Sequence, residues 1–516
     1  MCAILFTNID RVSKNQFLGA LKLMSHRGPD YSGYYDDNNF KLGHNRLKIQ
    51  DLEERSNQPF FSQDGRYVCI FNGEIYNFKE LAEKHNITLR TTSDTELLVE
   101  LYAKHGESMV SMLNGMFAFV IYDRISRKIF VARDRLGIKP IYFYSSSEGI
   151  IISSEVNAIL KLVKSVELDD IGVRQYKKLR SFFNDRTLYR GISMFPAAHF
   201  SYYDSLQLKS KFIKYWEVDF TLDKEINDEE LEFLLRSSVK YRNISDVPVG
   251  TYLSGGMDSS IITSLAKQTN SWSVGFKDNN EFVYARMVSE HCNTVHHETV
   301  VQYQDFIPAL NHMIQIRKEP LSVPNEVPLY LMTKKVKDKN TVVLSGEGAD
   351  ELLFGYDRIF WWANNNDWSI ESFDKYYSYG SGNDLEIIED VMGKYEKYDS
   401  CLEKVSAFFQ IEHLHGLLRR LDNSTMLNSV EGRVPFVDHR IIELMATATF
   451  NYRSDYGNNI KAPLKRIFQK LLPEEIFSRK KVGFPVPLEK IFSCHKDSIM
   501  DAWLEYNLNY LINRVL

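Results

Sequence analysis

Cysteine is scarce in this chain and has no arrangement that would use it for cross-links. The five cysteines lie far apart along 516 residues, and no two of them form a C-x-x-C pair. Disulfide-stapled domains need an even, closely spaced set of cysteines, and cysteine zinc sites need paired ones. We therefore expect neither kind of site, and at most one or two cysteines with a chemical role.

Long apolar runs and an excess of basic charge are also absent. No run approaches the roughly 18 residues of a membrane helix, and the sequence does not begin with the basic segment and apolar core of a signal peptide. There are 63 Lys and Arg against 68 Asp and Glu, a formal net charge of −5. Binding to a phosphate backbone favours the opposite sign. These absences predict a cytoplasmic protein that binds neither membranes nor nucleic acid.

The length and the hydrophobic pattern divide the chain into two halves. A single core stops growing at roughly 250–300 residues, so at least two domains are expected. Up to about residue 154, short apolar strands alternate with turn signals around two helical stretches, 15–24 and 95–106. This pattern predicts an α+β domain rich in antiparallel strands. Residues 157–221 mix aromatic and basic side chains and are expected to be connecting structure.

From about residue 228 the pattern changes to an alternation of helices and strands. A helical period at 228–242 is followed by a strand and glycine loop at 247–256, a helix at 259–268 and a later strand at 340–346. Alternation of this kind predicts an α/β domain with a parallel sheet covered by helices. After residue 356 the chain is expected to be mainly helical.

The second residue, Cys2, raises a question of chemistry. Removal of the initiator methionine would give Cys2 a free α-amine beside its thiol. An α-amine titrates at about 7.7–8.0 and a thiol at about 8.5, so the amine can accept the thiol proton near neutral pH. The apolar residues 3–6 are also typical of a buried strand carrying an inert thiol. At this stage both interpretations stay open.

A glycine-rich loop, "SGGMDSS" at Ser254–Ser260, lies between a predicted strand and a predicted helix. Its backbone N–H groups and the positive helix end suit a pyrophosphate, and the hydroxyls of Ser254, Ser259 and Ser260 add donors. It lacks the lysine of the GxxxxGK[ST] loop. This favours an enzyme that splits ATP between its α- and β-phosphates over the alternative of a plain surface loop.

An acidic loop, "SGEGADE" at Ser345–Glu351, follows a second predicted strand. Carboxylates beside a triphosphate would repel it unless a magnesium ion bridges the two kinds of oxygen. Both loops fall beyond the carboxyl ends of parallel strands, where such folds bind ligands. The sequence therefore predicts Asp258 and Asp350 as metal ligands, with a solvated acidic loop as the alternative.

These motifs resemble those of the glutamine-hydrolysing asparagine synthetases, over nearly the whole chain and in the same order. Besides Cys2, the matching stretches of the first half are His26–Gly33, Gly43–Asp51, Asn72–Asn77, Thr91–Glu96 and Arg133–Phe143. Those of the second half are "SGGMDSS", "EFVYAR", "HHE", "SGEGADE", "RLDNSTM", "EGRVPFVDHR" and "RKKVGFPVP". The resemblance implies an N-terminal-nucleophile αββα glutaminase sandwich in residues 1–200, linker included. It implies a parallel-sheet ATP-pyrophosphatase domain, of the adenine nucleotide α-hydrolase type, in residues 220–516.

For the first half, the resemblance implies a glutaminase site. Cys2 would attack the glutamine amide, and Asn72 and Gly73 would donate hydrogen bonds to the tetrahedral oxyanion. Arg46 would pair with the α-carboxylate of glutamine. The α-ammonium would be held by Glu74 and Asp94, and backbone contacts would come from Leu47, Lys48, Ile49 and Gln50.

For the second half, the resemblance implies an ATP site with Mg²⁺. Glu347 would assist formation of an acyl-adenylate, and Lys461 would stabilise charge as ammonia displaces AMP. Arg433 and Arg479 are expected to make phosphate or architectural contacts. The implied ATP-binding positions are Leu253, Ser254, Gly255, Gly256, Asp258, Ser259, Ser260, Val274, Ser345 and Gly346.

The activity that the resemblance implies is asparagine synthesis from glutamine, ATP and aspartate, with release of AMP and pyrophosphate. A homodimer is compatible with it. The stretch "KEPLSVPNEVP" at Lys318–Pro328 departs from the family where the acceptor pocket is expected. The alternative is therefore the same chemistry on another carboxylate, such as a sugar acid in surface-polysaccharide synthesis.

Three other classes fit less well. The net acidity and the complete glutaminase half argue against a tRNA-modifying adenylating enzyme, and "SGGMDSS" stands where glucosamine-phosphate synthase would need a sugar isomerase. A non-enzymatic relative should have lost its polar site residues.

Because ammonium is not a nucleophile, we also expect an apolar interior passage between the two sites, and a domain interface less charged than the outer surface.

Overall fold

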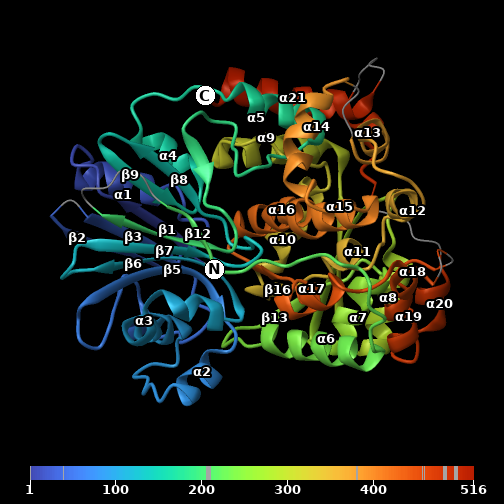
Figure 1. The fold of residues 1–516 in the computed structure, drawn as a ribbon, viewed down its shortest axis with the longest axis horizontal. Helices are drawn as coiled ribbons and strands as arrows, with labels where there is room; N and C mark the ends of the chain where they lie inside the picture. The colour runs from blue at the N-terminus through green and yellow to red at the C-terminus, as the bar shows by residue number, and fades with distance from the viewer. Residues whose placement is uncertain are drawn as a thin grey trace.

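The computed structural model describes residues 2–38, 40–204, 211–378, 382–455, 457, 459–479, 485–492 and 498–516. Residues 480–484 of the predicted "RKKVGFPVP" motif lie outside this set. Figure 1 shows a half built on antiparallel sheets beside a half with a parallel sheet and many helices. None of the helices described is both long and apolar enough to cross a membrane.

The first half contains two six-stranded antiparallel sheets. The first sheet has the order β10 (Ile192–Met194), β8 (Tyr142–Ser146), β9 (Gly149–Ser153), β1 (Ala3–Thr7), β3 (Phe40–Arg46) and β2 (Tyr31–Asp37). The second has the order β12 (Ile213–Lys214), β11 (His199–Asp204), β7 (Lys128–Arg133), β6 (Gly115–Asp123), β5 (Tyr67–Ile75) and β4 (Phe60–Phe61).

The two sheets pack face to face because successive side chains of a strand point to opposite faces. Ile4 of the first sheet and Val120 of the second belong to one buried cluster between the sheets. Their neighbours Leu5 and Phe119 belong to two other clusters, beneath the helices. Those helices are α1 (Lys14–Lys22) and α4 (Val156–Leu162) on the first sheet, and α2 (Phe78–Lys84) and α3 (Asp94–His105) on the second. The predicted αββα sandwich is confirmed (Figure 1).

The segment 157–221 is more regular than its sequence indicated. It contains α5 (Asp170–Leu179) and the strands β10, β11 and β12. Strand β11 pairs with β7, for example Phe200 with Ala132. The interpretation of this segment as connecting structure was wrong, because β10 extends the first sheet and β11 and β12 extend the second.

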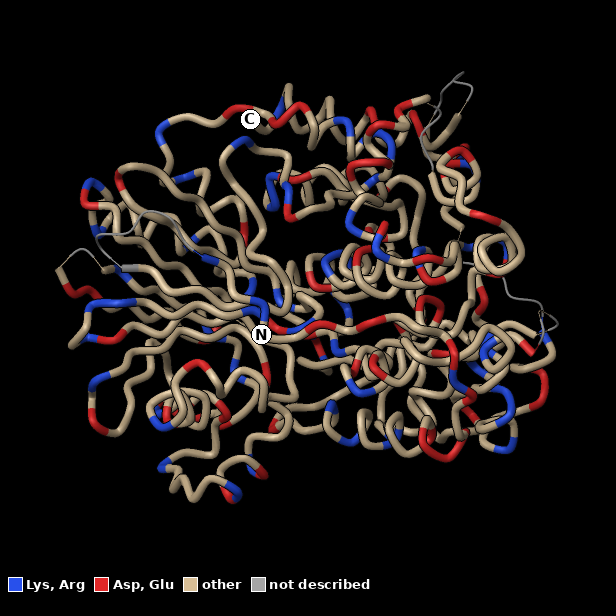
Figure 2. Tube along the Cα trace, in the orientation of Figure 1, with Lys and Arg blue, Asp and Glu red and all other residues tan. Residues whose placement is uncertain are grey.

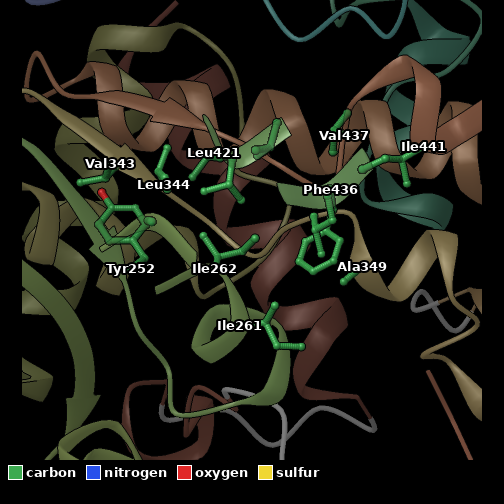
Figure 3. Close-up of a cluster of buried hydrophobic side chains, with 14 of the residues drawn as sticks. Tyr252, Ile261, Ile262, Val343, Leu344, Ala349, Leu421, Phe436, Val437 and Ile441 are labelled. Atoms are coloured by element: carbon green, nitrogen blue, oxygen red, sulfur yellow. The ribbon is translucent and has the colours of Figure 1, made fainter. Parts of the chain in front are cut away.

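The second half is built on a five-stranded parallel sheet, as predicted. Its order is β15 (Val295–Val301), β14 (Asn270–Phe276), β13 (Val249–Tyr252), β16 (Val342–Leu344) and β17 (Glu431–Arg433). The accompanying helices are α6 (Asp228–Arg242), α7 (Met257–Ala266), α8 (Phe282–Cys292), α9 (Tyr303–Arg317) and α10 (Glu326–Val336). Figure 3 shows Val343 and Leu344 of β16 near Ile262 of α7 in the buried core.

Helix α6 begins and ends where its local sequence predicts. The side chain of Asn227 caps the first turn by accepting from the N–H of Glu229, and three acidic residues lie in that turn. Lys240 and Arg242 lie in the last turn. Both ends therefore complement the helix dipole, and the helix spans the predicted residues.

The remainder of the second half is helical, as predicted. The α-helices are α11 (Ala349–Leu352), α12 (Asp357–Asn365), α13 (Ile370–Tyr377), α14 (Leu385–Met392), α15 (Cys401–Phe408), α16 (Leu414–Met426), α17 (His439–Met445), α18 (Phe450–Ser454), α19 (Ala462–Phe468), α20 (Glu474–Ser478) and α21 (Ile499–Arg514). A π-helical turn, Phe409–His413, joins α15 to α16. Short 3₁₀ turns occur at Glu54–Ser56, Gly106–Met112, Gly393–Tyr395 and Leu488–Lys490.

The two halves meet through both apolar and charged residues. Leu47 and Ile138 of the first half belong to the same buried cluster as Leu421 of the second. Beside this cluster, Asp422 lies 2.8 Å from Arg27 and 3.4 Å from Lys139, all of them buried. Figure 2 shows charges of both signs in the central region as well as at the periphery. The expected apolar contact is present, but the paired buried charges were not anticipated.

Candidate active sites

Cys2 stands immediately before β1, in a small pocket of the first half. It is 8% exposed, its backbone N–H donates to Asn72 Oδ1 (3.0 Å), and its Sγ lies 4.0 Å from the carbonyl oxygen of Leu47. Burial raises the pKa of the Cys2 thiol, while the contact with Leu47 and the charge of Arg46 act in the opposite direction. A buried neutral thiol needs a base in order to react. The nitrogen of Cys2 itself is the group that loss of Met1 would turn into such a base.

The side-chain amide of Asn72 is buried next to Cys2. The residue is fully buried, and its Nδ2 finds no hydrogen-bond partner within the described part of the chain. Leaving a buried donor unpaired costs about 1–3 kcal/mol. At Gly73, a Cβ would lie 2.1 Å from the carbonyl oxygen of Met116, so the position requires glycine. Asn72 and Gly73 therefore have the arrangement expected of an oxyanion site, and the Nδ2 group of Asn72, next to Cys2, is available as a donor.

The predicted glutamine-binding residues gather around one pocket of about 30 Å³. Its lining includes Cys2, Arg46, Leu47, Ile49, Gln50, Gly73, Glu74 and Asp94. The N–H of Lys48 donates to Asp30 instead (2.8 Å), and neither Lys48 nor Asn72 is among the lining residues. Ser56, Gln58, Phe71, Ser93 and Thr95 complete the pocket and were not predicted. The volume holds about two water molecules, so glutamine can enter only when the pocket opens.

Charged groups of the pocket are bonded to the protein itself. The guanidinium of Arg46 donates to Asn57 Oδ1 and to the carbonyl of Glu53, both at 2.8 Å. Burial raises the pKa of Glu74 well above its usual value, and the nearby Asp94 adds to the shift. Burial likewise raises the pKa of Asp94, to about 7. The pocket thus holds two carboxylates that gain from a cationic ligand.

In the second half, the predicted phosphate loop connects β13 to α7. Gly255 has φ of +77°, and a Cβ there would lie 2.7 Å from Cβ of Tyr284. At Gly346 of the acidic loop, a Cβ would lie 2.9 Å from the backbone nitrogen of Ser259. The two predicted loops therefore touch, and glycine is required at both points of close approach.

The serine hydroxyls of the phosphate loop have different surroundings. The hydroxyls of Ser254 and Ser259 lie 2.9 Å apart. The hydroxyl of Ser260, which is fully buried, donates to the carbonyl of Gly256 (2.7 Å). The hydroxyl of Ser259 also donates to the carbonyl of Gly256 (3.1 Å), so both Ser259 and Ser260 shape the loop. Ser254 and Ser259 line the large cavity, and Ser260 is not among its lining residues.

A cavity of about 950 Å³ opens where the two loops meet. This is near the upper end of the range for small-molecule sites, large enough for a nucleotide and a second substrate. The predicted ATP-binding residues that line it are Leu253, Ser254, Gly256, Asp258, Ser259, Val274, Ser345 and Gly346. Gly255 and Ser260 are not among its lining residues.

Lys461 lies between the two predicted metal carboxylates. Its Nζ is 2.5 Å from Oδ2 of Asp258 and 2.7 Å from Oδ1 of Asp350, and the residue is 2% exposed. Burial by itself would lower the pKa of Lys461, but the two carboxylates outweigh it and raise the pKa, so the ammonium stays charged. A Cβ at Gly355 would lie 1.8 Å from Asp350 Oδ1. Glycine there allows the carboxylate and the ammonium to meet.

The pair Asp258 and Asp350 fits the predicted magnesium ion. Carboxylates that share one ammonium lie close enough to share a cation. Within the described ranges no group of three or more His, Cys, Asp or Glu residues is arranged as a metal site. Nucleotide sites, however, bind Mg²⁺ through one or two carboxylates, with phosphate and water oxygens completing the octahedron.

Glu347 has a partner that the sequence did not reveal. Nη2 of Arg420, on α16, donates to both carboxylate oxygens of Glu347, at 2.8 and 2.9 Å. Both side chains line the large cavity. The predicted catalytic acid is therefore oriented from a helix 73 residues further along the chain.

Arg433 connects the surroundings of the two sites. Its Nη2 lies 3.6 Å from Oε1 of Glu74, its Nε donates to Glu431 (2.6 Å), and its carbonyl accepts from the N–H of Ser345 (2.9 Å). The residue is fully buried and does not line the large cavity. Of the two roles predicted for Arg433, this placement favours the architectural one.

Arg479 lies against the phosphate loop. Its Nη1 donates to the carbonyl of Gly255 (3.0 Å), and its guanidinium lies 3.9 Å from the ring centre of Tyr284. It also pairs with Glu281. Arg479 therefore holds the loop from outside while lining the cavity.

Comparison with known proteins agrees with the two halves. The family model "Glutamine amidotransferase domain" matches residues 1–216, and "Asparagine synthase" matches residues 230–508. "Asparagine synthetase [glutamine-hydrolyzing] 1" of Bacillus subtilis (strain 168) is 28% identical, over 96% of this chain and 85% of its own length. "Asparagine synthetase B [glutamine-hydrolyzing]" of Escherichia coli (strain K12) is 28% identical, over 90% of this chain and 77% of its own length.

Among solved structures, the glutamine phosphoribosylpyrophosphate amidotransferase from B. subtilis matches with a TM-score of 0.31 and 14% identity, over 69% of this chain and 77% of its own. The matched domains imply glutamine and ATP as substrates. The family match to residues 230–508 covers more than half of the chain, and the amidotransferase match precedes it. The chain therefore belongs to the glutamine-hydrolysing asparagine synthetase family.

Proposed function

We propose that this protein releases ammonia from glutamine at Cys2 and transfers it to aspartate, which it activates with ATP, giving asparagine, AMP and pyrophosphate. The observation that carries the proposal is the presence on one chain of two separate sites. One is a thiol pocket with an unused amide donor, and the other is a large cavity built on a glycine loop and Lys461. The two share no lining residue within the described part of the chain.

At the first site, the free amine of Cys2 takes the thiol proton, and the sulfur attacks the amide carbonyl carbon of glutamine. The oxyanion that forms accepts hydrogen bonds from Nδ2 of Asn72 and the N–H of Gly73. Each such donor is worth about 2.7–4 kcal/mol in other enzymes. The amine then returns its proton to the leaving nitrogen, ammonia departs, and water cleaves the thioester to glutamate.

At the second site, the phosphate loop and the N-terminus of α7 hold the pyrophosphate portion of ATP. A carboxylate oxygen of the acceptor attacks the α-phosphorus, and pyrophosphate leaves. Lys461 neutralises charge on the phosphates. Asp258 and Asp350 would hold Mg²⁺, which would add charge neutralisation at the phosphate oxygens.

The last step is attack of ammonia on the acyl carbon of the adenylate, with loss of AMP. Glu347, which accepts two hydrogen bonds from Arg420, would take the proton that the attacking nitrogen loses. Ammonia must be neutral to attack. Exclusion of water by the buried interface would favour that form.

The assignment of aspartate rests on the names of the relatives, so the acceptor is tested directly. The purified protein is incubated with ATP, Mg²⁺, glutamine and one carboxylate at a time, and AMP and the amide product are measured by mass spectrometry. We expect AMP and asparagine in equal amounts with aspartate. Amidation of a sugar acid with aspartate inert would establish the alternative acceptor. Absence of AMP with every carboxylate would refute the proposed activity.

A further inference from the structure

Phe354 has a backbone conformation that phenylalanine rarely adopts. It lies just after α11 and directly before Gly355, and its φ is +54°. A positive φ is a genuine outlier for a bulky side chain, because Cβ crowds the backbone there. Such conformations persist only where the surrounding structure enforces them, and they cluster at functional sites. The side chains that hold Phe354 in place are therefore of functional interest.

The turn that contains Phe354 lies against Asp350 and Lys461. The N–H of Gly355 donates to the carbonyl of Asp350 (2.9 Å). A Cβ at Gly355 would lie 1.8 Å from Oδ1 of Asp350 and 2.5 Å from Cε of Lys461. Lys461 itself has a positive φ, of +53°. The position of this turn therefore determines where the ammonium of Lys461 and the carboxylate of Asp350 meet.

Arg453, in α18, packs on the ring of Phe354. Its guanidinium carbon lies 4.2 Å from the ring centre. The ring of Phe360, on α12, also lies 4.2 Å from that centre, at an angle of 28°. All three side chains are buried, and a cation is attracted most strongly to an aromatic face where water is excluded. Arg453 and Phe360 thus hold Phe354 from two separate helices.

The guanidinium of Arg453 is otherwise unpaired in the part of the chain that the structure describes. The residue is fully buried, and Nε, Nη1 and Nη2 all lack a hydrogen-bond partner there. Burial lowers the pKa of Arg453 to about 9, so the group still carries its charge at neutral pH. A buried charge without a partner destabilises a folded protein. Stability therefore does not account for an arginine at this position, whereas its contact with Phe354 does.

We propose that Arg453 is a positioning residue for the activation of the acceptor. Through the ring of Phe354 it holds the turn at Gly355, and the turn keeps Lys461 and Asp350 in register beside the phosphates. Neither Arg453 nor Phe354 is among the residues that line the large cavity, so both act through the turn. The inference rests on the proposed function and adds two residues, distant from the substrates, on which its rate depends.

The first test is Arg453→Met, which keeps much of the apolar volume and removes the cation. Acceptor-dependent pyrophosphate release is measured with ammonium chloride as nitrogen source, so the Cys2 site plays no part. We expect kcat to fall about tenfold, as for loss of a desolvated contact of this kind, with the KM for the acceptor unchanged. The Tm should stay the same or rise, because a buried unpaired charge has been removed.

The second test asks whether Arg453 acts through Phe354. Phe354→Leu removes the aromatic face and should lower kcat by a similar factor. The double variant should be no slower than the slower single variant, because two residues that act through one contact are not additive. Arg453→Lys keeps a cation over the ring and should recover part of the native kcat.

The matched control is Arg466→Met. The guanidinium of Arg466 lies 5.0 Å from the ring centre of Tyr452, but it is partly exposed and pairs with Asp228. Surface pairs of this kind contribute little. We expect native kcat in this variant.

Three results would overturn the inference. They are a native kcat in Arg453→Met, effects of Arg453→Met and Phe354→Leu that multiply in the double variant, and a lowered Tm whose loss of kcat Arg453→Lys does not reverse. The last of these would identify a merely structural role. If pyrophosphate release is lost in Lys461→Met but normal in Arg453→Met, the proposed function stands and this inference fails. If the native protein releases no pyrophosphate with any carboxylate, both fail.

Discussion

The pocket around Cys2 and the cavity around Lys461 differ in how far the protein itself fills them. The first encloses about 30 Å³ and the second about 950 Å³. In the first, Arg46 is bonded to the loop that covers it, through Glu53 and Asn57. In the second, the cation and its carboxylates lie at the wall of an open space. We therefore expect glutamine to displace protein contacts when it binds, whereas the second cavity already has the volume for a nucleotide and needs a change only at Lys461, which is bonded to both predicted metal carboxylates.

The two sites also differ in how their charges are balanced. Lys461 has both carboxylate partners in place. Glu74 and Asp94 are two buried acids near one another, with Arg433 at 3.6 Å from Glu74. The acids of the first site have raised pKa values and would gain from a cationic ligand, whereas the carboxylates of the second site already share a cation. The following experiments test this difference between the sites.

The largest effect is expected from Lys461→Met. Removing the ammonium leaves two carboxylates facing each other beside the phosphates, and losing one partner of a buried pair costs about 3–5 kcal/mol. Pyrophosphate release should fall by about 1000-fold or more, while glutaminase activity continues. The control is Lys470→Met, an exposed lysine on the same segment. Normal pyrophosphate release in Lys461→Met would show that this lysine has no role in the reaction.

Asn72→Ala should affect the other site only. Loss of the donor lowers kcat for glutamine hydrolysis by about 10²- to 10³-fold, because an oxyanion forms only along the reaction path. Synthesis from ammonium chloride should be unchanged. Steady-state kinetics with glutamine measure the effect. A raised KM with normal kcat would mean that Asn72 binds the substrate and does not stabilise the oxyanion.

The sequence predicted some elements of the second half better than others. Helix α6 and the loop after β13 were foreseen because a cap, a helical period and glycines act locally. Strand β15 was not, since "VHHETVV" carries polar residues where a buried parallel strand is usually apolar. Its histidines are satisfied by partners on β14, such as Ser271 and Ser273 for His296.

Contacts between distant segments were not accessible from the sequence. The pairing of Glu347 with Arg420 depends on how α16 packs beside the parallel sheet, and the approach of Arg433 to Glu74 depends on how the two halves pack. Arg180 comes from a segment interpreted as connecting structure. No local pattern indicates that it lines the synthetase cavity.

Arg433→Met tests the connection between the sites. Methionine preserves much of the volume but leaves Glu74 without its cation, so binding of the glutamine α-ammonium should be disturbed. We expect the KM for glutamine to rise by up to about tenfold, through loss of an ion pair whose atoms, 3.6 Å apart, are too far apart for a hydrogen bond. Arg433→Lys should restore part of the native value. An unchanged KM in Arg433→Met would show that the contact with Glu74 is without consequence.

The smallest effect concerns pH. The pKa of Asp94 is raised to about 7, mainly by burial, so this acid is increasingly protonated below pH 7. Only the ionised form pairs with the α-ammonium of glutamine. The KM for glutamine should therefore rise severalfold between pH 8 and about pH 6.5. The KM measured across this range should be flat in Asp94→Asn, and an equal slope in that variant would assign the titration elsewhere.

The most direct test of two separate sites is product formation by Cys2→Ala with two nitrogen sources. In the proposed mechanism the thiol serves only the release of nitrogen, and the acceptor is activated in the cavity that contains Lys461. The account predicts amide formation at background level with glutamine and at the native rate with ammonium chloride. Equal loss of both activities would contradict it.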